Sequence, residues 1–303
     1  MDILRRKVQQ FWIDGVLEQS VFRQTLYDLG VEMMHEAVAS PWGPIGTQIE
    51  RPGAPSQPLP PEQSVADVFD EHGGSLLILG EPGAGKTTSM LNLTRTLLEH
   101  IQNAEGNVAP QPVPVVFNLS SWSPDFPQLE DWLAKQMSLQ YQIPQVEGRK
   151  LLATGHLLPM LDGLDETSAA LRARCVEAIN DYVLARNLSG LLVCCRLKEY
   201  VACPVRLALN TAIRLTELSD EQVDAYLAAL GDQLAGLRHL LRRETAMRFD
   251  ARSPLWLNLM ARAYHGLSGD DLIREEENSA VVRRRQLLDA YRARMFRHAR
   301  EDV

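Results

Sequence analysis

The chain has 303 residues, 45% of them hydrophobic, and a net charge of -8. This length is enough for one large or two modest domains with a buried core, and the hydrophobic content is ordinary for a soluble globular protein. The acidic balance argues against a general nucleic-acid binder, because contacts with phosphate backbones need a basic surface. The composition therefore predicts a soluble globular protein for which nucleic acid is not an expected partner.

Cysteine usage and the N-terminus bear on the compartment in which the protein works. The four cysteines show no metal-type pairing with histidines, and the adjacent Cys194 and Cys195 lie in an apolar run typical of a protein core. Such usage is typical of reduced, cytosolic proteins. The basic residues after Met1 are not followed by the apolar run of a signal peptide, and no stretch is long enough for a membrane span. We therefore expect a cytoplasmic protein with no membrane partner.

The chain begins with a helical pattern over residues 1–40, with a candidate break at Gly15. Prolines then crowd residues 41–61, and because no helix tolerates that density, this segment is predicted to be a loop or linker. The segment from Ser64 to Glu71 is predicted to form a short helix ahead of the first strand.

Five β-rich runs follow, separated by segments with helical periodicity. The runs are Leu76–Leu79, Val113–Asn118, Leu157–Leu161, Leu191–Cys195 and Ala212–Leu215, and the helical segments cover 86–101, 128–141 and 168–187. Continuous apolar strands that alternate with helices are typical of a parallel sheet covered on both faces. After Leu215 the strands stop, and Ser219–Gln222 forms a capping-box signature at the start of a helix. Further helices are predicted near 232–250, 254–266 and 282–300.

These patterns predict an α/β fold with a five-stranded parallel sheet followed by a small helical domain. The expected parts are an N-terminal helical segment with a proline-rich linker (1–63), a nucleotide-binding α/β domain (64–217), a helical domain (218–281) and a last helix (282–303).

A phosphate-binding motif lies between the first β-rich run and the helix after it. Its residues are Gly80, Glu81, Pro82, Gly83, Ala84, Gly85, Lys86, Thr87 and Thr88, which match G-x-x-x-x-G-K-[S/T]. The strand before it and the helix after it are the context that this motif requires, and they disfavour the alternative of a plain glycine-rich turn. The motif predicts that backbone N–H groups surround phosphate oxygens, that Lys86 reaches the β- and γ-phosphates, and that Thr87 binds Mg²⁺.

Acidic residues follow the third run, which ends in Asp162-Gly163-Leu164-Asp165-Glu166. The carboxyl end of a strand is where open α/β sheets bind their ligands. Asp162 is predicted to hold the Mg²⁺ that Thr87 contacts, normally through water, and Asp165 or Glu166 to orient or deprotonate the attacking water. The alternative is that these carboxylates belong to a solvated turn.

The fourth run ends in Arg196, whose guanidinium is predicted to reach the γ-phosphate. Lys198 is the alternative cation. A third interpretation, in which Arg196 pairs with a neighbouring carboxylate, also stays open.

Together with Ser253-Pro254-Leu255-Trp256-Leu257, these segments resemble the NACHT domains of STAND-type signalling NTPases. The pattern D-[small]-h-D-E at 162–166 is fairly specific to NACHT domains, since most P-loop families have simpler acidic ends. Residues 11–17 and the dipeptide Pro41-Trp42 are also similar to segments that precede the phosphate loop in bacterial NACHT proteins. The resemblance spans nearly the whole chain.

The resemblance implies a P-loop NTPase whose sheet has the order 5-1-4-3-2, with the strands numbered along the chain. It makes Lys86, Asp165, Glu166 and Arg196 the catalytic candidates, and Thr87 and Asp162 the Mg²⁺ ligands. Pro254 would pack on the adenine, although a plain first-turn helix proline is its alternative. ATP or ADP is expected in preference to GTP. In the family an effector domain usually precedes such a core, and a winged-helix domain and a repeat-rich sensor follow. Residues 282–303 would lead into that winged helix.

The favoured hypothesis is a nucleotide-driven switch that binds and slowly hydrolyses ATP. Exchange or hydrolysis would change the relation between the α/β and helical domains and expose a surface for self-association. Resemblance alone suggests bacterial antiviral or stress signalling as the role, with the sensor or effector domains as partners. Two alternatives remain: an AAA+-type turnover ATPase, and a scaffold whose bound nucleotide is never hydrolysed.

Overall fold

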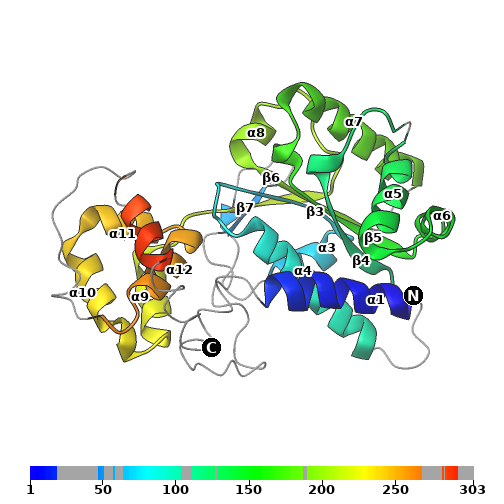
Figure 1. Ribbon diagram of the computed structural model, residues 1–303. Helices are drawn as coiled ribbons and strands as arrows, with labels where there is room; N and C mark the ends of the chain where they lie inside the picture. The colour runs from blue at the N-terminus through cyan, green and yellow to red at the C-terminus, as the bar shows by residue number, and fades with distance from the viewer. Residues whose placement is uncertain are drawn as a thin grey trace. The chain divides into compact units, whose positions relative to one another are not determined.

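A seven-stranded sheet organises the first of the two units into which the chain folds (Figure 1). The computed structural model describes residues 1–18, 47–50, 57–58, 64–103, 111–126, 128–186, 190–267, 282 and 284–292. The first unit, here called the α/β unit, contains residues 1–18 and 47–216, and the second, here called the helical unit, continues the chain from Glu217.

The sheet has the strand order β2-β1-β7-β3-β6-β5-β4. Its strands are β1 (Thr47–Glu50), β2 (Gln57–Pro58), β3 (Ser75–Gly80), β4 (Val113–Asn118), β5 (Leu157–Asp162), β6 (Leu191–Arg196) and β7 (Thr211–Leu215). The strands from β7 to β4 are parallel, and numbered along the chain they follow the order 5-1-4-3-2. All five predicted β-rich runs are therefore confirmed as strands.

The sheet extends beyond the five predicted parallel strands. At one edge β1 and β2 add two antiparallel strands beside β7, which the sequence did not predict. Both lie within residues 41–61, which the density of prolines had marked as loop or linker. β1 occupies a stretch without proline, and β2 is a two-residue edge strand that ends in Pro58, where a missing N–H need not break a ladder.

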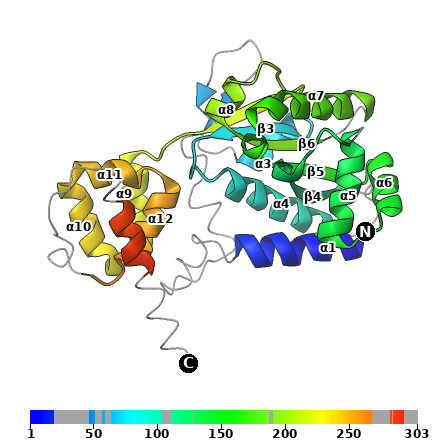
Figure 2. The ribbon, with the colours of Figure 1, turned by 45° about the horizontal axis from the view of Figure 1, so that its top comes forward.

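Helices cover both faces of the sheet. Figures 1 and 2 show α1 and α4 on one face and α7 on the other. The helices of this unit are α1 (Asp2–Val8), the π-helix η1 (Gln9–Leu17), α3 (Val65–Glu71), α4 (Lys86–Asn103), α5 (Leu129–Tyr141), α6 (Gln145–Ala153), α7 (Ala169–Arg186) and α8 (Leu197–Val201), with short 3-10 turns η2 (Leu119–Ser121) and η3 (Leu164–Glu166). The predicted helices are confirmed by α3, α4, α5 and α7.

Two helices, α6 and α8, were not predicted. α6 follows Pro144 and contains Gly148, two residues that normally interrupt helices in sequence patterns. A Cβ at Gly148 would lie 3.3 Å from the sulfur of Met137. The glycine therefore lets α6 approach α5 closely, and tertiary packing outweighs its low helix propensity.

The N-terminal residues pack on the α/β unit, whereas the sequence predicts a separate segment over residues 1–63. α1 continues into η1 through Gly15 without the predicted break, and η1 contacts α4. Trp12 Nε1 donates a hydrogen bond to the Tyr141 hydroxyl (2.6 Å), which donates to the carbonyl of Val116 in β4 (2.6 Å). These bonds hold the segment against α5 and the sheet. The predicted helical residues 19–40 lie outside the described part of the chain.

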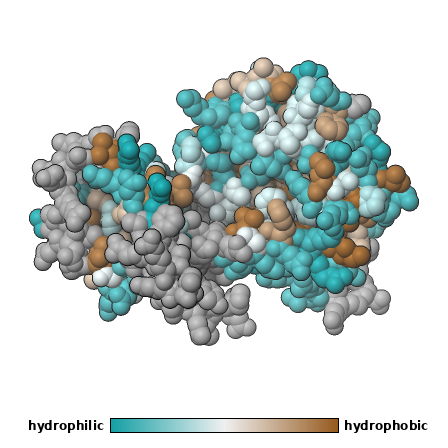
Figure 3. All heavy atoms as spheres, viewed as in Figure 1, coloured by the Kyte–Doolittle hydropathy of each residue, from teal (hydrophilic) through white to brown (hydrophobic). Residues whose placement is uncertain are grey.

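The core of the α/β unit is built on its parallel strands. Every residue of β3 is buried, as are all but the last residues of β4, β5 and β6. This is the burial expected of strands that are covered on both faces. The three half-buried last residues are polar, namely Asn118, Asp162 and Arg196. Hydrophobic side chains on the face shown in Figure 3 form scattered patches in a mainly hydrophilic surface.

The first helix of the helical unit begins at the predicted capping box, which is confirmed. The Ser219 hydroxyl accepts from the N–H of Gln222, and the Gln222 side chain accepts from the N–H of Ser219. The predicted helix at 232–250 is divided, because Glu244 is extended (φ -102°, ψ 90°). The elements are α9 (Asp220–Ala229), η4 (Asp232–Leu234), α10 (Ala235–Arg243), α11 (Thr245–Ala251) and α12 (Pro254–Ala263).

Residues 284–292 are helical and belong to the helical unit, whereas the sequence predicts a separate part from residue 282. Leu287 is buried in the core of this unit. The Arg284 guanidinium pairs with Asp250 (2.7 Å) and lies over the ring of Trp256, 5.1 Å from its centroid. The predicted helix beyond residue 292 lies outside the described residues.

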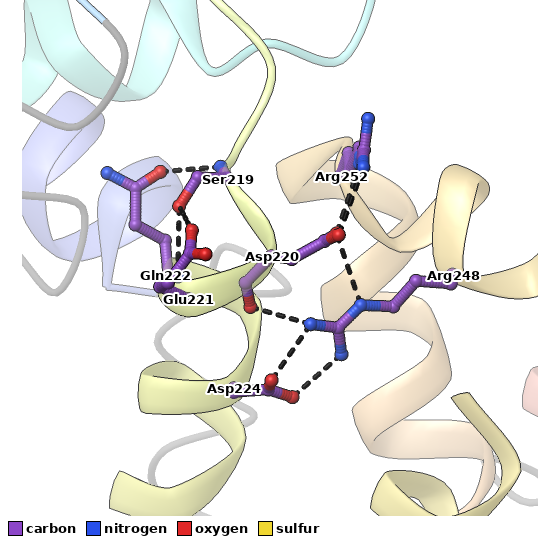
Figure 4. Close-up of polar contacts among 7 residues, drawn as sticks. All are labelled: Ser219, Asp220, Glu221, Gln222, Asp224, Arg248 and Arg252. Carbon is purple, nitrogen blue, oxygen red and sulfur yellow. Dashed lines mark hydrogen bonds and ion pairs between the residues drawn. The ribbon is translucent and has the colours of Figure 1, made fainter. Parts of the chain in front are cut away.

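An ion-pair network joins α9 to the end of α11 (Figure 4). Asp220 Oδ1 accepts from Arg248 Nε (3.2 Å) and from Arg252 Nε (3.1 Å). Arg248 also donates from both terminal nitrogens to Asp224, at 2.7 and 2.9 Å. Each carboxylate of the network is thus paired with at least one guanidinium.

Among the described residues, no helix combines the length and the apolar character needed to cross a bilayer.

Candidate functional site

The carboxyl ends of the four parallel strands β3, β4, β5 and β6 lie side by side at the same end of the sheet. Gly80 at the end of β3 is in register with Arg196 at the end of β6, and Asn118 at the end of β4 is in register with Asp162 at the end of β5. Because parallel strands place their carboxyl ends at the same edge, the phosphate-loop motif, the acidic segment and Arg196 meet there as predicted. Asn118 joins them, although the sequence did not single it out.

The 80–88 loop has the backbone that its glycines permit. Gly83 and Gly85 have φ values of 79° and 91°, in the left-handed region that other residues rarely adopt. A Cβ on Gly80 would lie 3.2 Å from the carbonyl oxygen of Leu215 in β7, so this glycine allows the loop to leave the sheet. α4 begins at Lys86, directly after the turn. Bare backbone at a helix N-terminus is an arrangement suited to a phosphate group.

The Lys86 ammonium group lies over this loop. Its Nζ donates to the carbonyls of Gly80 (2.9 Å) and Glu81 (3.1 Å). Cys194 of β6 supports the same residue from within the core, with its sulfur 3.9 Å from the Lys86 carbonyl oxygen. The lysine charge is therefore placed beside the loop in which a phosphate would need neutralising.

Thr87 and Asp162 are in direct contact. The Thr87 hydroxyl donates to Asp162 Oδ2 (2.7 Å), and the N–H of Gly163 donates to Asp162 Oδ1 (2.9 Å). Burial raises the pKa of Asp162, the two hydrogen bonds oppose that shift, and the nearby charges of Glu166 and Asp165 add to it.

A hydroxyl and one carboxylate at this spacing are oxygen ligands of the kind that Mg²⁺ uses with phosphates and water. Within the described residues no three His, Cys, Asp or Glu side chains are grouped to hold a metal by themselves. The residues present fit a Mg²⁺ that takes most of its ligands from water and a bound phosphate.

The acidic segment turns sharply at Gly163, whose φ is 76°. A Cβ at this position would lie 3.1 Å from Glu166 Oε2 and 3.2 Å from Asn118 Oδ1. The pattern therefore requires glycine at position 163, because of its backbone conformation and because the side chains of Glu166 and Asn118 lie too close for a Cβ. Glu166 is exposed, and within the described part of the chain its carboxylate makes no hydrogen bond or ion pair.

Asp165 and Arg196 form an ion pair. Arg196 Nε lies 2.7 Å from Asp165 Oδ2, and the Arg196 N–H donates to Asp165 Oδ1 (3.1 Å). The Asp165 side chain is 8% exposed and that of Arg196 is 43% exposed. Pairing with a neighbouring carboxylate, one of the interpretations that the sequence left open, is therefore observed, and the reach of Arg196 to a γ-phosphate stays a prediction. Lys198, the alternative cation, is exposed on α8.

One buried residue of this region was missed in the sequence. Arg172 of α7 donates hydrogen bonds to main-chain carbonyls of the acidic segment and of α8. A usable signal existed, because Arg172 shares one helical face with the apolar Val176 and Ile179. A charged residue on such a face is expected to bind something specific.

Pro254 is described within the helical unit alone. It is the first residue of α12, and its carbonyl accepts from Asn258 Nδ2 (2.9 Å). This is the place expected of a first-turn helix proline. Its contact with an adenine base stays a prediction.

No model of a known protein family matches the chain, and no curated protein matches it either. Fold and site therefore rest on the residues themselves.

Proposed function

We propose that the chain is a P-loop NTPase of the NACHT type that binds ATP with Mg²⁺ and hydrolyses it slowly. The observation that carries the proposal is the Thr87–Asp162 contact of 2.7 Å. It joins the hydroxyl after the lysine of the 80–88 loop to the acid that ends β5, two residues 75 positions apart in the chain. A phosphate-binding motif requires this hydroxyl and this carboxylate to hold one metal ion, and two unrelated turns would not be expected to bring them together.

In this proposal the loop backbone receives the phosphates, and Lys86 moves from the carbonyls of Gly80 and Glu81 to the β- and γ-phosphate oxygens. Thr87 and Asp162 hold Mg²⁺, which supplies positive charge against the phosphate oxygens when bound. No large rearrangement of the main chain is needed, because only the Lys86 side chain has to exchange partners.

The two acids after Gly163 take different roles. Arg196 binds the Asp165 carboxylate twice, with its guanidinium and with its main-chain N–H. We assign Asp165 the role of orienting this guanidinium toward the γ-phosphate. Glu166 is exposed and lies beside Asn118, so it is the carboxylate available to accept a proton from the attacking water.

The output of this activity is proposed to be a conformational switch. Nucleotide exchange or hydrolysis would bias the relation between the two units and release a surface for self-association, in bacterial antiviral or stress signalling. The signalling role is supported by family resemblance only. The nucleotide is proposed to be ATP, with ADP as the resting ligand.

The test is a nucleotide-binding titration with and without Mg²⁺, preceded by identification of any nucleotide that co-purifies. Lys86→Ala is expected to weaken ATP binding about 100-fold, because a charged contact to phosphate contributes about 3 kcal/mol. Lys150→Ala, at a side chain that is 68% exposed on α6, is the matched control and is expected to bind normally. Equal binding by Lys86→Ala and the parent protein would contradict the site. Bound ATP that stays intact during long incubation with Mg²⁺ would favour the scaffold alternative.

A further inference from the structure

Arg172 is the most buried arginine that contacts the site region, at 8% exposure. It extends from α7 and donates only to main-chain oxygens within the described residues. The bonds run from Nε to Leu164 (3.3 Å), from Nη1 to Glu199 (3.3 Å), and from Nη2 to Asp165 (3.0 Å) and Thr167 (2.9 Å).

This arrangement is unusual for a buried charge. A guanidinium taken out of water is normally compensated by a carboxylate. Two of its acceptors, Asp165 and Glu199, are acidic residues, but each accepts through its carbonyl, and the Asp165 carboxylate is engaged with Arg196. An apolar side chain could fill the same space in the core. What arginine adds at this position is the set of hydrogen bonds that its planar guanidinium makes. Its planar fork directs several N–H groups at once, which a lysine cannot do.

The four carbonyls belong to two different segments. Leu164, Asp165 and Thr167 lie in and just after the acidic turn η3, and Glu199 lies in α8, directly after Arg196. Arg172 therefore connects the segment that carries Glu166 to the segment that carries Arg196. Asp165 is held at both ends, by Arg196 at its carboxylate and by Arg172 at its carbonyl.

We propose that Arg172 is a positioning residue for hydrolysis, which sets the spacing between Glu166 and Arg196 without contacting the nucleotide. This inference rests on the proposed NTPase function. Small displacements of reacting groups strongly reduce the rate of a chemical step. Nucleotide affinity is proposed to depend on the 80–88 loop, Thr87 and Asp162, to which Arg172 makes no hydrogen bond. Its loss must therefore lower the rate of hydrolysis and leave nucleotide affinity intact.

The experiment compares Arg172→Lys with Arg174→Lys in the full chain. Arg174 lies on the same helix and is exposed, so its replacement is the matched control. Both variants keep the charge and lose a guanidinium, but only at Arg172 does that guanidinium donate to the main-chain carbonyls of the site region. Arg172→Lys is expected to hydrolyse ATP about 10- to 100-fold more slowly at saturating Mg²⁺-ATP, with a Kd for ATP within about threefold of the parent. Arg174→Lys is expected to match the parent in both.

A second variant separates positioning from a general loss of structure. Arg172→Ala leaves a space in which millimolar methylguanidinium can bind, and the added cation is expected to restore part of the rate. The parent and an Arg174→Ala variant should not respond. Hydrolysis by Arg172→Lys at the parental rate would overturn the inference, as would a fall in affinity as large as the fall in rate. If the parent itself binds no ATP, the proposed function fails instead, so the two failures are distinguishable.

Discussion

Asp162 in the α/β unit and Asp220 in the helical unit differ in how their charges are compensated. Burial raises the pKa of Asp162, and its hydrogen bonds come from a hydroxyl and a backbone N–H with no cation among them. Hydrogen bonds from Arg252 and then Arg248 lower the pKa of Asp220. The charged form is therefore disfavoured in the first case and favoured in the second.

The two regions also differ in what satisfies their charged groups. In the network of Figure 4, the aspartates of α9 and the arginines near α11 compensate one another within the chain. At the strand ends, Asp162, Asp165 and Glu166 gather with Arg196 as the cation paired to one of them. A network whose charges are paired within the chain stabilises a fold, whereas the carboxylates of Asp162 and Glu166, which form no ion pair among the described residues, are suited to binding a cation. This difference supports the proposal that the strand ends, and not the network of Figure 4, form the functional site.

The largest effect is expected at Glu166, whose carboxylate has no hydrogen-bond or ion-pair partner among the described residues. Glu166→Gln should reduce hydrolysis about 100-fold or more, because the amide cannot accept the proton of the attacking water. Asp165→Asn should reduce it only about tenfold, since the amide oxygen still accepts from the Arg196 N–H. Single-turnover hydrolysis of radiolabelled ATP measures both rates. A larger loss for Asp165→Asn would exchange the roles of the two acids.

Asp162→Asn is expected to separate function from stability. The amide keeps the shape and removes a charge that burial disfavours, so the nucleotide-free protein should unfold at a higher temperature than the parent. The same change removes a ligand of Mg²⁺ and should weaken Mg²⁺-dependent ATP binding by about 10- to 100-fold. Calorimetry measures both quantities. A lower unfolding temperature for Asp162→Asn would show that the ionised carboxylate is stabilising and that the contrast with Asp220 does not hold.

Arg248→Ala addresses the other side of the comparison. This side chain is 15% exposed and pairs with both aspartates of α9, so its loss should destabilise the helical unit by about 1 kcal/mol, limited by the solvent around its partners. Nucleotide binding should change little. Arg243→Ala, at an exposed position in the neighbouring α10, is the control and should change stability by about 0.5 kcal/mol or less. Denaturation monitored by hydrogen exchange in α9 and α11 would localise the effect; equal losses for the two variants would refute it.

The elements that the sequence predicted well are those with strong local signals. The parallel strands β3, β4, β5 and β6 are built on continuous apolar runs, and the capping box at Ser219 specifies where α9 begins. The strands β1 and β2 were not predicted because prolines crowd the sequence around them, and their structure depends on the pairing of β1 with β7. The helix α6 was not predicted because it contains a glycine, and its structure depends on packing against α5. Such contacts join residues that are distant in the chain, and no local pattern reports them.

The candidate site shows the same division. The positions of the 80–88 loop after β3 and of Asp162 at the end of β5 were predictable, because each directly follows an apolar run typical of a strand. The pairing of Asp165 with Arg196 was open, since it depends on which of two adjacent acids turns toward β6. The apolar helical face around Arg172 marked it as a residue with a specific contact, but its partners could not be named, because they are backbone carbonyls, which every residue possesses.

The smallest predicted effect is a difference in how the two regions respond to acid. The pKa values of Asp220 and Asp224 are lowered by their arginine partners, so their contribution to stability is complete above the unfolded-state pKa of about 3.9 and is lost as the pH falls through the lower folded values. The raised pKa of Asp162 acts in the opposite sense. The folded state then holds the proton more tightly than the unfolded state, and acidification toward about pH 4 relieves the burial of charge.

Carbon-detected NMR titration of the three carboxyl groups should therefore give Asp162 a midpoint above about 3.9, and Asp220 and Asp224 midpoints below it. In Arg248→Ala the Asp224 midpoint should move up toward the ordinary value while that of Asp162 stays unchanged. A common midpoint for all three groups would remove the electrostatic distinction between the two regions.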